Sequence, residues 1–261
     1  MKKNLLISVF LIFSIGMQSQ ILITLLFGDK LNSEGLEFGL EGGMSYSAIT
    51  GLESNNKESN FFLGFYFDIL LKNQWSLETG VMVKSTLGND DLTENDLDFL
   101  GVSIYDEETE GVYSQKSGYF IVPALIKYKF KNHIYVEAGP QFGLLTKGWV
   151  EYNFDIDGKS GRIKETNTDM MNRFDMGITT GAGFRLLQGL GWTVGVKYYY
   201  GFVDVYKDKS GSKNSSLFLK MNIPIGLSEK SKDEILKQKE IKQKKKANKK
   251  LEKEKNKTNN S

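Results

Sequence analysis

Thirteen charged side chains recur inside segments of regular alternation, and they are the residues with the most capacity for chemistry. Carboxylates and amines at fixed spacing act as general acids and bases, or they neutralise one another in ion pairs. Because the set has six acids and seven bases, we predict a structural network of paired charges rather than a catalytic site. The residues are Glu37, Glu41, Asp68, Glu78, Lys84, Lys127, Lys129, Glu137, Arg173, Asp175, Arg185, Lys197 and Lys220.

Each of these charges lies on one side of a two-residue alternation. In residues 36–47, Phe38 and Leu40 fall on one parity, whereas Glu37 and Glu41 fall on the other. Since successive side chains of a strand point to opposite faces, such a sheet has an apolar wall and a wall of charge and glycine. It therefore needs two different solvents. The same split returns in seven later segments, which are residues 61–70, 75–84, 119–130, 134–145, 173–186, 192–202 and 217–225.

The connections between these eight segments alternate in length. The short ones are residues 71–74, 131–133 and 187–191, and the long ones are residues 48–60, 86–117, 146–172 and 203–215. Alternating short and long connections with an even number of strands are typical of outer-membrane barrels, which have periplasmic turns and extracellular loops. We therefore predict an all-β fold over residues 21–227, an eight-stranded antiparallel transmembrane β-barrel with periplasmic termini. Its place is the cell outer membrane, and its apolar wall contacts outer-membrane lipid.

Composition limits the alternatives. Cysteine is absent from the 261 residues, so disulfide bonds and thiolate metal sites are excluded. After residue 20 no run of 18 or more apolar residues occurs, so a helical membrane span is not expected. The chain has 27 glycines, many of them on the charged parity of the strands. There they leave room for long side chains inside a narrow barrel.

The two ends of the chain differ from its middle. Residues 1–20 are predicted to be a secretory signal peptide, because Lys2 and Lys3 precede the apolar stretch from Leu5 to Met17. Residues 228–261 contain 13 Lys and 6 acidic residues, a net charge of +7. We predict a Lys-rich periplasmic tail that is disordered or partly helical. Its charge would attract an anionic periplasmic surface or a protein partner.

Other motifs give little support for catalysis or metal binding. His133 is the only histidine and falls in a short connection, so a serine triad is not expected. Residues 86–117 are rich in carboxylates that suit Ca²⁺ or Mg²⁺, although acidic loops are usually only solvated surface. The run from Asn153 to Gly158 begins like a calcium loop, but Lys164 stands where the closing Glu is required. We predict a hairpin turn at Asp157–Gly158, protruding beyond the membrane. We expect no catalytic residue, no cofactor, no metal and no nucleic-acid partner, so the protein is not expected to be an enzyme.

Four segments carry a resemblance to a known family: GLEFGLEGG at 35–43, YFIVPALIKY at 119–128, VEAGPQFG at 136–143 and VKYYYG at 196–201. They resemble the outer-membrane β-barrel family of Bacteroidetes, whose members are often labelled porin-family or PorT-like. The likeness covers about residues 35–227 and implies a barrel in the outer membrane. One branch of the family is associated with protein secretion. The extension that follows Leu227 departs from the pattern, because the last strand is then not at the C-terminus.

Three functions remain open. An eight-stranded barrel is just wide enough for side chains to fill it, which favours a structural or interaction role with a filled lumen. A narrow channel, or a component of a transport or secretion complex, would need a hydrated path through the lumen. A soluble lipocalin-like lipid-binding barrel would turn the apolar parity inward around its ligand and the charges outward.

Overall fold

The computed structural model describes residues 35–103, 111–156, 158–186 and 191–225. The predicted signal peptide and the predicted tail lie outside the described residues. Within them the chain is almost entirely antiparallel strand, and no helix is long and apolar enough to cross a membrane. The elements are β1 (Leu36–Ile49), β2 (Asn56–Lys72), β3 (Trp75–Lys84), β4 (Thr86–Asp90), α3 (Glu94–Leu100), β5 (Gly111–Lys129), β6 (Ile134–Ile156), β7 (Lys159–Thr166), the 3-10 turn η2 (Thr168–Met170), β8 (Phe174–Arg185), β9 (Thr193–Asp204) and β10 (Lys213–Pro224).

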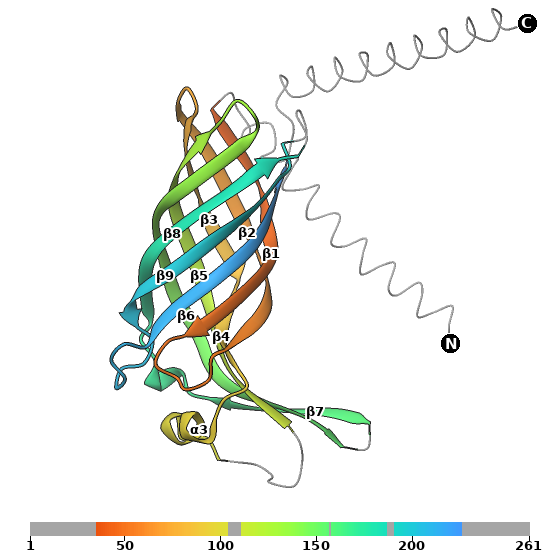
Figure 1. The fold of residues 1–261 in the computed structure, drawn as a ribbon, viewed down its shortest axis with the longest axis vertical. Coiled ribbons are helices and arrows are strands. Elements are labelled where there is room, and N and C mark those ends of the chain that lie inside the picture. The colour runs from red at the N-terminus through yellow and green to blue at the C-terminus, as the bar shows by residue number, and fades with distance from the viewer. Residues whose placement is uncertain (1–34, 104–110, 157, 187–190, 226–261) are drawn as a thin grey trace, which may run out of the picture.

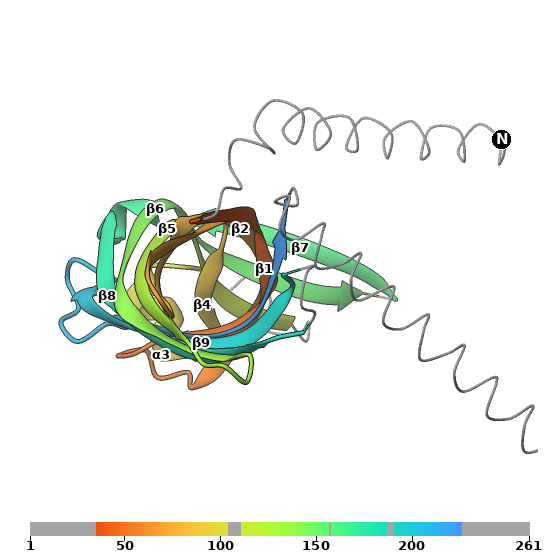
Figure 2. The same cartoon turned by 90° about the horizontal axis from the view of Figure 1, so that it is seen from above.

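Eight strands of the described residues close into a ring through backbone hydrogen bonds. The order around the ring is β1, β2, β3, β5, β6, β8, β9 and β10, and β10 pairs with β1 to close it. Figure 1 shows the tilted strands from the side, and Figure 2 shows the ring from above. Each ring strand overlaps one of the eight predicted segments and differs from it by a few residues at the ends. The predicted fold class is therefore confirmed.

The apolar parity of the strands faces outward and the charged parity faces the interior. Phe61, Phe142 and Tyr198 are 48%, 45% and 47% exposed, whereas Glu41 and Lys197 are buried. A polypeptide in water would not leave a continuous belt of this size exposed, but lipid chains solvate it. The lipocalin-like alternative is wrong, because it requires the opposite orientation of the two walls.

One end of the barrel, called here the turn end, has the short connections. Asn73 and His133 adopt left-handed backbone conformations with φ of 55° and 71°, which lets the chain reverse within a few residues. The start of β1 and the end of β10 meet at the same end, since Gly39 pairs with Pro224. The described barrel therefore begins and finishes at the turn end.

The opposite end contains more regular structure than predicted. The connections at residues 86–117 and 146–172 are long, as predicted, but they include β4, α3, β7 and the outer parts of β5 and β6. Beyond the membrane both faces of a strand meet water, so the apolar and polar split that marks the barrel strands fades. The predicted hairpin is confirmed by the pairing of Ile156 with Lys159 and by the φ of 74° at Gly158, although Asp157 lies outside the described residues.

Two features project from this end, as Figure 1 shows. The first, called here the arm, is the three-stranded sheet of residues 111–118, 147–156 and 159–166. The second, called here the cap, is helix α3 and its flanks. The Thr93 side chain accepts from Asp96 N at the start of the helix, and Gly101 ends it in the left-handed conformation, φ 66°.

Candidate functional site

Four carboxylates and four lysines meet inside the barrel towards its turn end. We call this group the lumen network. Every ring strand except β8 contributes to it, so it forms only when the ring is closed. Its members are Glu41, Asp68, Glu78, Glu137, Lys127, Lys129, Lys197 and Lys220.

Lys220 is the centre of the lumen network. Its Nζ lies 2.6 Å from Glu78 Oε1 and 2.6 Å from Glu137 Oε1, and its side chain has no exposed surface. Lys127 also contacts Glu78, and its Nζ lies 3.6 Å from Glu137 Oε2. The two lysines thus share the same pair of carboxylates. Removal of one lysine would leave buried carboxylates with too little positive charge nearby.

The remaining members extend the lumen network across the barrel. Glu41 on β1 contacts Lys197 on β9, and both side chains are buried. Asp68 accepts from Lys129 Nζ at 2.7 Å and from Lys127 Nζ at 3.3 Å. Lys129 is the most exposed member, because it lies nearest to the turn end. The four positive and four negative charges balance, as a dry interior requires.

Three other predicted residues lie inside the barrel but outside the lumen network. Arg185 Nη2 donates to Glu37 Oε2 at 3.0 Å at the turn end, where Tyr66 also donates to Glu37 at 2.9 Å. Asp175 lies near the opposite end and accepts from Asn214 Nδ2 at 2.8 Å. Among the described residues Asp175 has no ion pair, so hydrogen bonds hold it instead.

Lys84 and Arg173 were wrongly predicted to face the lumen. An irregularity in the pairing of β2 with β3 places Lys84 opposite Leu63, which faces outward. Lys84 is exposed there, and its Nζ lies 5.6 Å from the centre of the Phe61 ring. Arg173 precedes the first residue of β8 and lies in an exposed bend. The alternation is interrupted just before Lys84, and it begins only after Arg173.

Glycine makes room for the large side chains of the interior, as predicted. A methyl group at Gly195 or Gly183 would collide with the hydroxyl of Tyr135, which lies across both strands. On the other side of the Tyr135 ring, the Nζ atoms of Lys127 and Lys220 lie 4.6 Å and 5.5 Å from its centre. The Tyr135 ring thus packs against two lysines of the lumen network and against the glycines of β8 and β9.

The outer half of the lumen contains a cluster of buried apolar side chains, beside buried polar ones such as Asp175 and Asn214. Phe62 and Phe218 contact edge to face with ring centres 5.2 Å apart, and neither has exposed surface. We call this cluster the apolar plug. It continues into the cap through Leu97 and Leu100 of α3, which are buried. Other members are Ile49, Met82, Leu87, Tyr119, Ile121, Leu145, Val150, Met171, Tyr199, Val205 and Tyr206.

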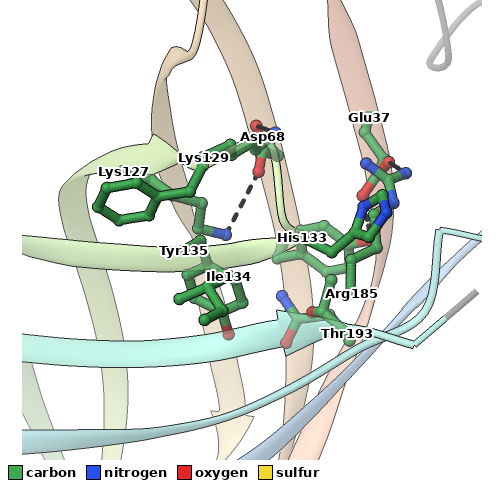
Figure 3. A pocket seen from close by; sticks show the side chains of 12 residues that line it. Glu37, Asp68, Lys127, Lys129, His133, Ile134, Tyr135, Arg185 and Thr193 are labelled. Atoms are coloured by element: carbon green, nitrogen blue, oxygen red, sulfur yellow. Dashed lines mark hydrogen bonds and ion pairs between the residues drawn. The ribbon is translucent and has the colours of Figure 1, made fainter. Parts of the chain in front are cut away.

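A pocket opens at the turn end, where members of the lumen network form part of its wall, and Figure 3 shows its side chains. Its volume is about 170 Å³. The ion pairs Lys129–Asp68 and Arg185–Glu37 lie on its walls, and Tyr135 lies at its inner end. Thr193, Asn222, Tyr66, Lys127, Phe130, His133 and Ile134 complete the lining.

The arm carries a charge cluster that was not predicted. Glu151 accepts from Lys116 Nζ and lies near Lys164 Nζ, both at 2.9 Å, and Trp149 Nε1 donates to it at 3.3 Å. Burial alone would raise the pKa of Glu151, but the hydrogen bonds from the two lysines outweigh it and lower the pKa from 4.5 to about 2. Continuing the alternation of Trp149, Glu151 and Asn153 past the expected strand end would have revealed the cluster.

Asp90 and Asp96 of the acidic segment 86–117 have structural partners. Asp96 Oδ1 and Oδ2 accept from the backbone nitrogens of Glu53 and Ser54 at 2.7 Å and 2.9 Å, which ties the β1–β2 loop to α3. Asp90 accepts from Ser114 Oγ at 2.6 Å. The described residues contain no group of three side chains arranged to hold a metal ion. Asp106, Glu107, Glu108 and Glu110 lie outside them.

Comparison with known proteins agrees with this architecture. A family model described as "Outer membrane protein beta-barrel domain" matches residues 18–207. No curated protein matches the chain.

Solved structures similar to the chain are barrels of distant sequence. Ail of Yersinia pestis, solved with the heparin analogue sucrose octasulfate, is 12% identical over 74% of this chain and 99% of its own, with a TM-score of 0.39. Neisserial surface protein A is 10% identical over 73% of this chain and 99% of its own, with a TM-score of 0.34. OprG of Pseudomonas aeruginosa is 12% identical over 73% of this chain and 93% of its own, with a TM-score of 0.29.

Proposed function

This chain belongs to the outer membrane protein β-barrel domain family, and from that premise we propose that it is a sealed barrel with a structural or interaction role. It lies in the outer membrane, where its apolar wall contacts lipid. Barrels of this kind have short periplasmic turns and longer extracellular segments. By that rule the turn end faces the periplasm, and the arm and the cap face the exterior.

The observation that carries the proposal is the filling of the lumen at two successive levels. Lys197 and Lys220 have no exposed side-chain surface at the first level, and neither do Phe62 and Phe218 at the second. An ion or solute would have to separate buried ion pairs and then cross an apolar layer, and both steps are costly. This filling supports display of the outer end over conduction.

The arm at the outer end is stabilised by side-chain packing on both faces of its sheet. The rings of Tyr113 and Tyr152 stack with centres 4.3 Å apart, and Phe154 continues the stack at 5.2 Å from Tyr152. On the opposite side of the same sheet lies the charge cluster around Glu151. A sheet with packing on both sides holds its shape beyond the membrane, which suits recognition of a partner and needs no catalytic group.

Swelling of proteoliposomes tests the sealed barrel. We expect vesicles that contain the folded protein to swell in isotonic glycine or arabinose no faster than empty vesicles. Vesicles with an open porin give the positive control, and a heat-dependent shift in gel mobility verifies that the protein is folded. Swelling that increases with the amount of folded protein would reject the proposal in favour of a narrow channel.

The resemblance to PorT-like proteins extends this proposal to a second candidate, a component of a transport or secretion complex. The arm and the cap would then bind the partners of that complex. Deletion of the gene is expected to stop secretion of exported proteins while the outer membrane stays intact. Normal secretion in the deletion strain would reject this second candidate, and only the structural or interaction role would remain.

A further inference from the structure

The pocket at the turn end has an inner end with unmet hydrogen-bonding capacity. Asn222 Oδ1 lies there without a hydrogen-bond partner among the described residues, whereas the hydroxyls of Tyr135 and Thr193 interact with each other. Asn222 and Tyr135 are only 2% and 3% exposed. Since buried polar atoms in folded proteins almost always have a hydrogen-bond partner, Asn222 Oδ1 indicates an occupant that donates a hydrogen bond.

The entrance of the pocket has the opposite character. The side chains of Lys129 and Arg185 are both 35% exposed there, and each uses one hydrogen bond on a wall carboxylate, Asp68 or Glu37. An ammonium has three donors and a guanidinium has five, so both cations keep donors free for an incoming group. Figure 3 shows the two pairs on opposite sides of the pocket, with Thr193 below them. The entrance thus favours an anionic group.

We propose that this pocket binds a small zwitterion of the amino-acid type. The carboxylate would lie between Arg185 and Lys129 at the entrance, and the ammonium would donate to Asn222 Oδ1 further in. A simple anion would leave Asn222 Oδ1 without a hydrogen-bond donor. A simple cation would have no negative group to pair with Lys129 and Arg185.

The size of the pocket fits this ligand class. Its volume is about 170 Å³, and a water molecule in the liquid occupies roughly 30 Å³. The space therefore accommodates one small amino acid and not a lipid or a folded segment. The ring of Tyr135 closes the inner end, so the ligand would enter and leave on the periplasmic side. Binding here is compatible with a sealed lumen and does not depend on it.

Calorimetric titration of the full chain in detergent tests the site with three probes. Alanine carries both charges, whereas propionate and ethylamine carry one each. We expect alanine to bind at least tenfold more tightly than either half, because each half loses one charge-assisted hydrogen-bonding group. No binding of alanine would mean that water alone fills the pocket, and equal binding of propionate would mean a general anion site. Either result overturns the proposal.

Two variants locate the binding. Asn222→Leu is expected to weaken alanine binding at least tenfold and to leave propionate unchanged. Arg185→Gln, at the more exposed entrance, is expected to weaken alanine and propionate together. Lys84→Gln removes a charge from the outward face and is the matched control, with unchanged binding. Each variant is first checked for folding by heat-dependent gel mobility. If the Asn222 variant does not fold, alanine binding to the Arg185 variant serves as the test of the site. Unchanged alanine binding in the folded variants would overturn the proposal.

Discussion

The two halves of the lumen are filled by opposite means. Towards the turn end Lys220 and Glu137 belong to a group of charges that pair with one another and are mostly buried. Towards the arm end Phe62 and Phe218 belong to an apolar core like that of a water-soluble domain. Both fillings use side chains of the same inward parity. The alternation of each strand decides only which side chains point into the lumen. The chemical type of those side chains decides how much a substitution there changes the stability of the barrel.

The two halves of the lumen differ in how their side chains contact the rest of the molecule. The apolar plug continues into the cap, where Leu97 and Leu100 of α3 bury their side chains outside the ring. Apolar contacts of this kind are local and nearly additive when the sites are far apart. The charges of the lumen network are shared between several partners, so its members depend on one another. We therefore expect larger and less additive effects in the charged half.

The largest effect is expected from Lys220→Met, which leaves Glu78 and Glu137 with too little positive charge. Breaking a buried ion pair from one side typically costs about 3–5 kcal/mol. Urea unfolding of the barrel in lipid vesicles would measure it. The double variant Lys220→Met with Glu137→Gln is expected to recover part of the loss. Equal and additive losses would show that the lumen network is not coupled.

A smaller effect, confined to the outer end, is expected from Leu97→Ala. The side chain is buried in the apolar plug, and such truncations cost about 2–5 kcal/mol. Because α3 lies outside the ring, the cost should fall on the cap, and limited proteolysis within residues 91–103 should speed up. The unfolding midpoint of the barrel should hardly move. A midpoint shift as large as that of Lys220→Met would contradict the division into two halves.

The arm should respond to acid. The folded pKa of Glu151, about 2, lies below its ordinary value of 4.5. Its bonds therefore stabilise the arm fully above about pH 4.5, and this contribution is lost as the pH falls towards 2. Trp149 donates to Glu151, so its fluorescence reports the change when Trp75 and Trp192 are replaced by Phe. The Glu151→Gln variant should remove the transition, and a transition that persists in it would assign the change to another group.

The smallest effect is expected from Lys84→Gln. Because the side chain is exposed on the outer face, the change should alter the free energy of unfolding by no more than about 0.5 kcal/mol. The same substitution at Lys127, which contacts three buried carboxylates, should cost several times more. Equal losses at the two positions would place Lys84 back among the interior charges.

Strand parity predicts the ring, its inside and its outside well, because lipid and lumen impose different side chains on the two faces. It places Lys127 and Lys220 in the interior without any knowledge of their partners. It fails at Lys84, where an irregular pairing shifts the alternation, and at Arg173, where the strand has not yet begun. The spacing of residues within one segment reveals neither the irregular pairing with the neighbouring strand nor the residue at which a strand begins.

Other features could not be predicted because they depend on contacts between distant segments. The inward aromatic residues Phe62 and Phe218 interrupt a polar parity in sequence, and only the closed ring brings them together. The extension of β5 and β6 into the arm is hidden because water on both faces removes the periodic signal. The pocket at the turn end depends on Asn222 and Thr193, which are ordinary polar residues in the sequence.

Single-molecule conductance across a planar bilayer tests the sealed lumen most directly. Insertion of the folded barrel is expected to give no current steps above the baseline at moderate voltage, because the lumen network and the apolar plug close it in series. Steady steps that scale with salt concentration would contradict this account. They would show a hydrated path through the lumen.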